Sequence, residues 1–146
     1  MLKILVVEDD LMIADMAEEI LVDAGYEVCG IARTVPDGVA LARQHKPDLA
    51  LIDLRLADGG LGTSIAAQLV PFGALGILYA TGNMAQVILT ATDGHACFSK
   101  PYRSLDLVHG LKIVSEIVTT GKAEQPFPRG FHVLHPATPA PSVMGT

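Results

Sequence analysis

Four short apolar runs in this chain each lead into polar or charged residues, and this repeated pattern restricts the fold more than any other feature. The runs and the residues that follow them are 4–7 before Glu8 and Asp9, 48–52 before Asp53, 75–80 before Thr81 and 95–99 before Lys100. Short continuous apolar runs are typical of strands that are covered on both faces, as in a parallel sheet.

Helical patterns fill the segments between the expected strands. After a strand at 2–7, apolar residues recur at helical spacing. Asp10 can cap the start of this helix, and Gly25 suits a left-handed helix end. The further expected elements are a strand at 26–32, a helix from Thr34 to about His45, a strand at 49–53, a helix at 63–70, a strand at 75–80, a helix at 83–91, a strand at 96–99 and a helix capped by Ser104. Five strand–helix units in a row predict an α/β fold in which helices cover both faces of a parallel sheet.

The polar residues at the strand ends are expected to converge. In a parallel α/β sheet, the carboxyl ends of the strands lie at one edge, where ligands bind. Each residue has a simpler interpretation, such as Asp9 or Asp10 capping a helix, but equivalent positions in four units favour a common site. Clustered carboxylates raise one another's pKa unless a counter-ion is present. The sequence therefore predicts a divalent cation here, and oxygen ligands suit Mg²⁺.

Composition limits the classes of partner. The 146 residues suit one domain, half of them are apolar, and the net charge of -6 with no cationic run argues against direct nucleic-acid binding. No apolar stretch approaches the ~20 residues of a membrane span, and no leader pattern is visible, so a cytoplasmic location is expected. Cys29 and Cys97 lie in apolar runs and are expected to be buried, reduced thiols.

The C-terminal part breaks the strand–helix pattern. Residues 122–146 contain five prolines and no long periodic apolar face. We predict a domain at 1–121 followed by an extended or disordered proline-rich tail at 122–146. The alternative is a segment that docks on the domain or on a partner through its apolar side chains, which are Phe127, Phe131, Val133 and Leu134.

The chain resembles the response-regulator receiver domain of two-component signalling over roughly residues 2–121. The resemblance rests on Ile-Leu-Val-Val-Glu-Asp-Asp at 4–10, Leu-Ile-Asp at 51–53, Tyr-Ala-Thr-Gly at 79–82 and Phe-Ser-Lys-Pro at 98–101. It implies a flavodoxin-like doubly wound (βα)5 fold with a five-stranded parallel sheet in the order 2-1-3-4-5. It also implies a signalling protein that promotes only its own phosphorylation and dephosphorylation, and is otherwise not an enzyme.

The same resemblance assigns roles to the converging residues. Asp53 would be the nucleophile that receives a phosphoryl group from a histidine kinase or histidine phosphotransfer protein, forming an acyl phosphate. Glu8, Asp9, Asp53 and the main-chain carbonyl of Arg55 would bind Mg²⁺. Asp10 would be the helix cap and a secondary candidate ligand.

Two further roles concern the phosphoryl group after transfer. Lys100 would contact a phosphoryl oxygen, for which a compact ammonium is suited. The Thr81 hydroxyl would move to the phosphoryl group and report the modification. Arg55 and Asn83 occupy positions that vary in the family and tune its reaction rates.

The chain departs from the family pattern at three positions. Cys97 replaces the usual aromatic switch residue, Ala57 replaces a proline, and Gly82 replaces an alanine. Residues 79–82 are similar to a receiver subgroup known for Phe-Ala-Thr-Gly, which commonly lacks the aromatic switch, although the tyrosine expected shortly afterwards is missing. Phe98 could act in place of the switch, but a core position is the favoured interpretation.

We interpret the chain as a stand-alone receiver whose output is protein–protein contact through its fourth helix (83–91), fifth strand (96–99) and fifth helix (from Ser104). A weak homodimer through this face stays open. The alternatives are a phosphorylation-independent adaptor, motivated by Cys97 and Ala57, and a receiver fragment of a larger regulator. A phosphatase of the haloacid dehalogenase type is disfavoured, because Arg55 stands where such enzymes need a second aspartate.

Overall fold

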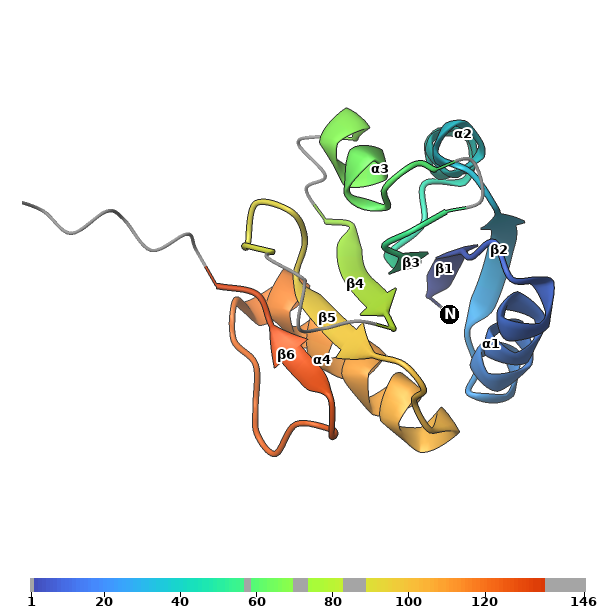
Figure 1. Ribbon diagram of the computed structural model, residues 1–146. Helices are drawn as coiled ribbons and strands as arrows, with labels where there is room; N and C mark the ends of the chain where they lie inside the picture. The colour runs from blue at the N-terminus through green and yellow to red at the C-terminus, as the bar shows by residue number, and fades with distance from the viewer. Residues whose placement is uncertain (1, 57–58, 70–73, 83–88, 136–146) are drawn as a thin grey trace, which may run out of the picture.

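The chain folds into one mixed sheet with helices on both faces (Figure 1). The computed structural model describes residues 2–56, 59–69, 74–82 and 89–135. In chain order the elements are β1 (Lys3–Val7), α1 (Leu11–Asp23), β2 (Glu27–Ala32), α2 (Val35–His45), β3 (Leu49–Asp53), α3 (Thr63–Gln68), β4 (Gly76–Thr81), β5 (Ala96–Ser99), α4 (Ser104–Thr120) and β6 (Phe131–Val133). The predicted α/β flavodoxin-like class is confirmed.

The strand order is β2-β1-β3-β4-β5-β6. The first five strands are parallel and follow the predicted order 2-1-3-4-5. The predicted count of five strands is wrong, because β6 adds an antiparallel sixth strand at the edge of β5. Its residues fall in the segment that we expected to be an extended tail, so the docking alternative describes residues 131–133 correctly. Residues 136–146 of that segment lie outside the described part of the chain.

Two core layers are separated by the sheet, because alternate residues of each strand point to opposite faces. Ile4 and Val6 of β1 pack with α1 and α4 on one face, whereas Leu5 and Val7 pack with α2 and α3 on the other. All of β4 is buried. This burial on both faces explains why the central strands are continuous apolar runs rather than alternating ones.

The helix ends show where the local capping rules predicted the structure correctly and where they did not. Asp10 caps α1 as expected, since its Oδ1 accepts hydrogen bonds from the main-chain N–H groups of Met12 (3.0 Å) and Ile13 (3.3 Å). Gly25 has the expected positive φ of 94°. The predicted cap by Ser104 is wrong, because the residue at the N-cap of α4 is Arg103, which makes no side-chain capping bond.

The helix predicted at 83–91 falls largely outside the described residues. Of its last three positions, 89–91, none is helical. The α4 of the structure therefore corresponds to the fifth helix predicted from the sequence. Within the described ranges, no helix has the length and apolar character needed to cross a bilayer.

Candidate functional site

The predicted site residues come together at the carboxyl edge of the sheet. Glu8 follows β1, Asp53 ends β3, Thr81 ends β4 and Lys100 follows β5. Carboxylate oxygens of Glu8, Asp9 and Asp53 lie within 4.8 Å of one another. The convergence expected from the strand-end pattern is therefore what the structure shows.

Lys100 joins this acidic group across the sheet edge. Its Nζ lies 2.7 Å from Oε1 of Glu8 and 3.4 Å from Oδ2 of Asp53. Burial on its own would lower the pKa of Lys100, but the hydrogen bond to Glu8 and the charge of Asp53 outweigh burial and raise this pKa above its usual value. The ammonium therefore stays charged and holds the two carboxylates together.

Glu8 is the most buried of the three carboxylates, with 5% of its surface exposed. Burial raises the pKa of Glu8 to about 7, and the neighbouring Asp53 adds to the rise, while the hydrogen bond from Lys100 and one from the Asp10 main chain oppose it. The main-chain N–H of Asp10 donates to Oε2 of Glu8 at 3.2 Å. Without a cation, burial and the neighbouring Asp53 therefore destabilise the ionised form of the Glu8 carboxyl group.

The donor set fits a hard divalent cation. Three carboxylates from two adjacent strand ends supply oxygen ligands, and their mutual repulsion is relieved when a cation binds. The Asp10 side chain is occupied by its cap on α1 and lies outside this group. Arg55 lies beside the group, since its main-chain N–H donates to Oδ1 of Asp53 at 3.4 Å.

Thr81 is buried, with 7% of its surface exposed, at the last position of β4. Its main-chain carbonyl accepts a hydrogen bond from the main-chain N–H of Lys100 at 2.8 Å. A main-chain hydrogen bond therefore links Thr81, which carries the hydroxyl, directly to Lys100, which carries the ammonium.

Cys97 and Phe98 lie on opposite faces of β5. Cys97 is buried in the core layer that contains α2 and α3, and burial raises the pKa of its thiol to about 11, which keeps the thiol protonated and unreactive. The Phe98 ring packs in the other layer, 5.5 Å from the Tyr102 ring and 5.7 Å from the Phe131 ring. The expectation that Phe98 is a core residue is confirmed. Cys97 is buried as expected, whereas Cys29 is only partly buried, and neither of these two described cysteines forms a disulfide.

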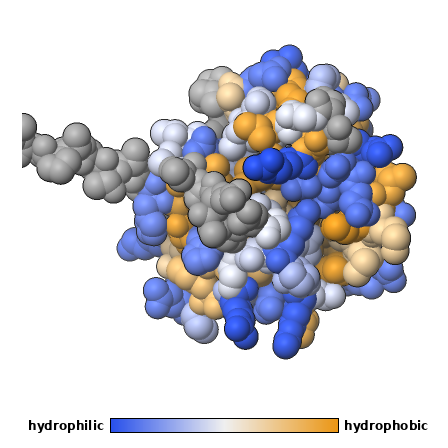
Figure 2. Space-filling model, in the orientation of Figure 1, coloured by the Kyte–Doolittle hydropathy of each residue, from blue (hydrophilic) through white to orange (hydrophobic). Residues whose placement is uncertain are grey.

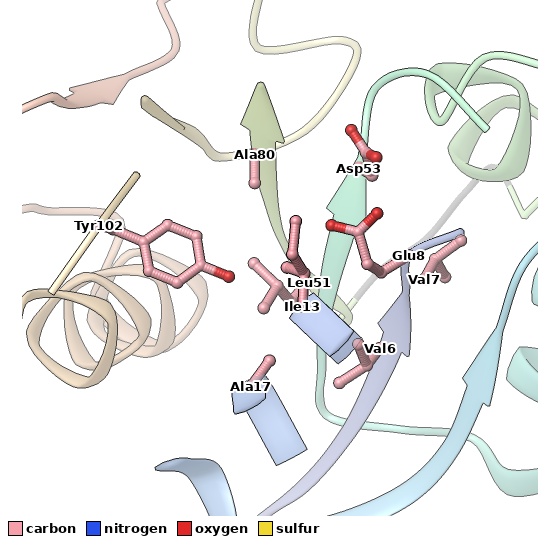
Figure 3. Close-up of a pocket in the computed structure, with 9 residues that line it drawn as sticks. All are labelled: Val6, Val7, Glu8, Ile13, Ala17, Leu51, Asp53, Ala80 and Tyr102. Atoms are coloured by element: carbon pink, nitrogen blue, oxygen red, sulfur yellow. The ribbon is translucent and has the colours of Figure 1, made fainter. Parts of the chain in front are cut away.

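Two residues near the site were not found from the sequence. Tyr102 lines a small cavity together with Glu8 and Asp53, and its side chain points toward that cavity from the β5–α4 loop (Figure 3). Gly62 lies so close to the chain that an added Cβ would overlap the main-chain oxygen of Asp53. The available signals were the position of Tyr102 two residues after Lys100 and the glycine-rich stretch after β3.

Of the positions that depart from the family pattern, Ala57 lies outside the described residues, as does Asn83. Gly82 is described, and among the described residues no atom lies within 4 Å of a Cβ placed there. An alanine at this position would therefore meet no steric obstacle from the described part of the chain.

Comparison with curated proteins gives partial and full-length relatives. The "Phyllosphere-induced regulator PhyR" of Methylorubrum extorquens is 34% identical over 80 residues, which cover 54% of this chain and 30% of PhyR. The "Transcriptional regulatory protein PdtaR" of Mycobacterium tuberculosis is 37% identical over 54 residues, which cover 37% of this chain and 26% of PdtaR. The match thus spans less than a third of either relative. "Chemotaxis protein CheY" of Thermotoga maritima is 27% identical over 117 residues, covering 78% of this chain and 98% of CheY.

Solved structures and a family model also show similarity to receiver domains. A CheY-like response regulator receiver domain protein from Methanospirillum hungatei JF-1 has a TM-score of 0.71 and 28% identity, covering 84% of this chain and 99% of that chain. The signal receiver domain of a modulated diguanylate cyclase from Desulfovibrio desulfuricans G20 has the same fold, with a TM-score of 0.72, 24% identity and coverage of 84% and 99%. The family model of the response regulator receiver domain matches residues 4–112. With the strand-end carboxylates and lysine in place, the chain belongs to the response-regulator receiver family of two-component signalling.

Proposed function

We propose that this chain is a cytoplasmic, Mg²⁺-dependent receiver that is phosphorylated on Asp53 by a histidine kinase or histidine phosphotransfer protein and acts by binding a downstream protein. The observation that carries the proposal is the position of Asp53. Its carboxylate lies within the acidic group of Glu8 and Asp9 and 3.4 Å from the Lys100 ammonium. A nucleophile, cation ligands and a fixed positive charge are thus available at one place.

The chemistry is a single displacement at phosphorus. An Asp53 carboxylate oxygen forms the new O–P bond while the P–N bond to the donor imidazole breaks and its electron pair stays on the imidazole. The Lys100 ammonium lies close to Asp53, so it would exchange its contact with Glu8 for one with a phosphoryl oxygen on Asp53. Glu8, Asp9, Asp53 and the Arg55 carbonyl would hold Mg²⁺, which when bound offsets the charge of the carboxylate and the phosphoryl group.

Thr81 is the proposed reporter of phosphorylation. Its hydroxyl would turn toward the phosphoryl group, and the direct main-chain bond between Thr81 and Lys100 supports a shift that involves both strands. We place the output on the face that the family resemblance implies, of which the described residues contain β5 and α4.

A surface beside the site suits the phosphodonor. An apolar groove of about 360 Å³ lies between α1 and the loop before α4, lined by Ile13, Met16, Ala17, Ile20, Lys100, Pro101, Tyr102 and Ser104. Leu11, Met12 and Leu105 are exposed, and apolar atoms are visible over α1 at the right of Figure 2. An apolar helical surface of a donor that rests on this groove would lie beside Lys100, which contacts Asp53.

The second candidate is an adaptor that binds its partner without phosphorylation. The buried Cys97 favours it, because the side chain that usually responds to phosphorylation is absent there. In either case the chain could be the receiver part of a larger regulator, as the partial coverage of PhyR and PdtaR suggests.

Intact-mass measurement with acetyl phosphate and Mg²⁺ tests the proposal. We expect one added phosphoryl group on the natural chain and none on the Asp53→Ala variant, with folding of both verified by circular dichroism. The matched control is Asp15→Ala, which removes an exposed carboxylate of α1 and should leave labelling unchanged. A folded natural chain that acquires no phosphoryl group would support the adaptor instead.

A further inference from the structure

The outer edge of β5 is covered by the chain's own C-terminal segment. The main-chain N–H of Ser99 donates to the carbonyl of Gly130, and that of Leu134 donates to the carbonyl of His95, both at 2.9 Å. Between these bonds the strands are antiparallel, with Cys97 opposite His132. The edge of β5 therefore already binds an extended segment in register.

A hollow above β5 fits one aromatic side chain of that segment. Phe131 is 5% exposed, and its ring centroid lies 5.7 Å from that of Phe98 and 5.6 Å from that of Phe127. A Cβ at Gly110 of α4 would lie 3.1 Å from ring atoms of both Phe98 and Phe131. Because Gly110 has no side chain, α4 leaves room there for the Phe131 ring. Glycine is otherwise an unfavourable residue inside a helix.

The rest of the segment completes a simple pattern. His132 is exposed, and Val133 is partly buried against the same core layer as Phe131. An aromatic residue, a polar residue and an aliphatic residue in sequence thus satisfy the β5 edge. Main-chain hydrogen bonds would provide affinity for any such strand, while the hollow would select the aromatic residue.

The segment is the shortest of the described strands and lies at the edge of the sheet. It forms a strand of three residues, whereas β4 and β5 pair at four positions on the opposite edge. Residues 121–130, which connect it to α4, contain neither helix nor strand. Short edge strands with long connections are the first parts of a sheet to open locally.

We propose that the β5 edge is a docking site for an extended segment of a partner protein, with the pattern aromatic–polar–aliphatic, and that residues 130–135 are its built-in competitor. Partner binding requires that β6 leaves and that the partner strand takes its place beside β5. The proposal does not require phosphorylation at Asp53, so either proposal can fail alone.

Substitutions at His132 test the competition. Because the hydrogen-bonded pairs 95–134 and 99–130 are in the same phase of the ladder, position 132 is a donor position. His132→Pro removes that donor and displaces β6, while the buried Phe131 is retained. His132→Ala is the matched control, since it removes the same exposed side chain but keeps the main-chain N–H.

The probe is a labelled synthetic peptide of residues 126–135, measured by fluorescence anisotropy with the full chain. We expect the His132→Pro chain to bind it about tenfold or more tightly than the natural and His132→Ala chains, because a tethered competitor acts at millimolar effective concentration. A peptide with Phe131→Ala should bind at least tenfold more weakly. Hydrogen exchange should show that the Ser99 amide loses protection in His132→Pro and regains it with peptide. The Asp48 amide, bonded to Lys3 at the far end of the sheet, should stay protected and verify folding.

Three results would overturn the proposal. Equal peptide affinities in the three chains would mean that β6 does not compete for the edge. Tight binding of the peptide without its phenylalanine would mean that the hollow does not select the segment. A natural chain with the mass of a dimer in light scattering, which becomes a monomer in His132→Pro, would identify a second copy as the occupant in place of a partner protein.

Discussion

Raising the pH should destabilise the Mg²⁺-free chain through one carboxyl group, that of Glu8. Burial raises its pKa from 4.5 to about 7, with a further rise from Asp53 and an opposing hydrogen bond from Lys100. Between these two pH values the folded chain keeps a proton that the unfolded chain has released. The free energy of unfolding therefore falls as the pH rises through this window.

The expected size follows from the difference between the folded and unfolded pKa values. That difference is about 2.5 units, and each unit corresponds to about 1.4 kcal/mol. The Glu8 side chain is only 7% exposed, so solvent screens it little. Glu8 should then account for a loss on the order of 3 kcal/mol, a large share of the ~5–15 kcal/mol typical of a domain. The pKa of Lys100 is raised from 10.5, so its stabilising contribution is lost only at higher pH, outside this window.

Urea unfolding over a series of pH values in chelator measures this loss, with Glu8→Gln as the reference chain. The natural chain should lose stability relative to Glu8→Gln between pH 4.5 and about 7 and show a constant difference above that range. Saturating Mg²⁺ should stabilise the natural chain most at high pH, because the cation competes with the proton for Glu8. Parallel pH profiles for the two chains in chelator would refute the reasoning.

Two further predictions concern residues around the site. Lys100→Met removes the ammonium that contacts Glu8 and Asp53. It should slow labelling by acetyl phosphate about tenfold or more in an intact-mass time course. An unchanged rate would remove Lys100 from the proposal. Gly62→Ala should lower the free energy of unfolding by about 2 kcal/mol, because the added Cβ meets the Asp53 carbonyl. Gly82→Ala is the control, since no described atom lies within 4 Å of a Cβ there. Equal urea midpoints for the two variants would contradict the close approach at Gly62.

Much of the site could be predicted because it depends on local patterns and topology. The run at 49–53 is a strand in the structure with the same bounds. Once parallel strands are inferred, their carboxyl ends must share an edge, and this alone brings Glu8, Asp53 and Lys100 together. No knowledge of side-chain packing was needed for that step.

The sixth strand could not be predicted, because its structure depends on a partner distant in sequence. Phe131–Val133 is a short segment downstream of two prolines, and only its pairing with β5 makes it a strand. A signal did exist in Gly110, an interior glycine of α4 whose missing side chain accommodates Phe131. The error at Ser104 has a different cause: the helix begins one residue earlier than the serine-cap rule suggests, and helix ends shift easily by one residue.

The loop after β5 also has a thermodynamic consequence. The main-chain N–H of Lys100 donates to Thr81, and that of the adjacent Ser99 donates to Gly130, so the candidate site and the β6 segment share neighbouring peptide groups. Coupling between two binding events is reciprocal at equilibrium. If a partner strand binds the phosphorylated chain tenfold more tightly, a saturating amount of that partner raises the equilibrium constant for forming the acyl phosphate by the same factor. Such a partner would then regulate this receiver as well as receive its signal.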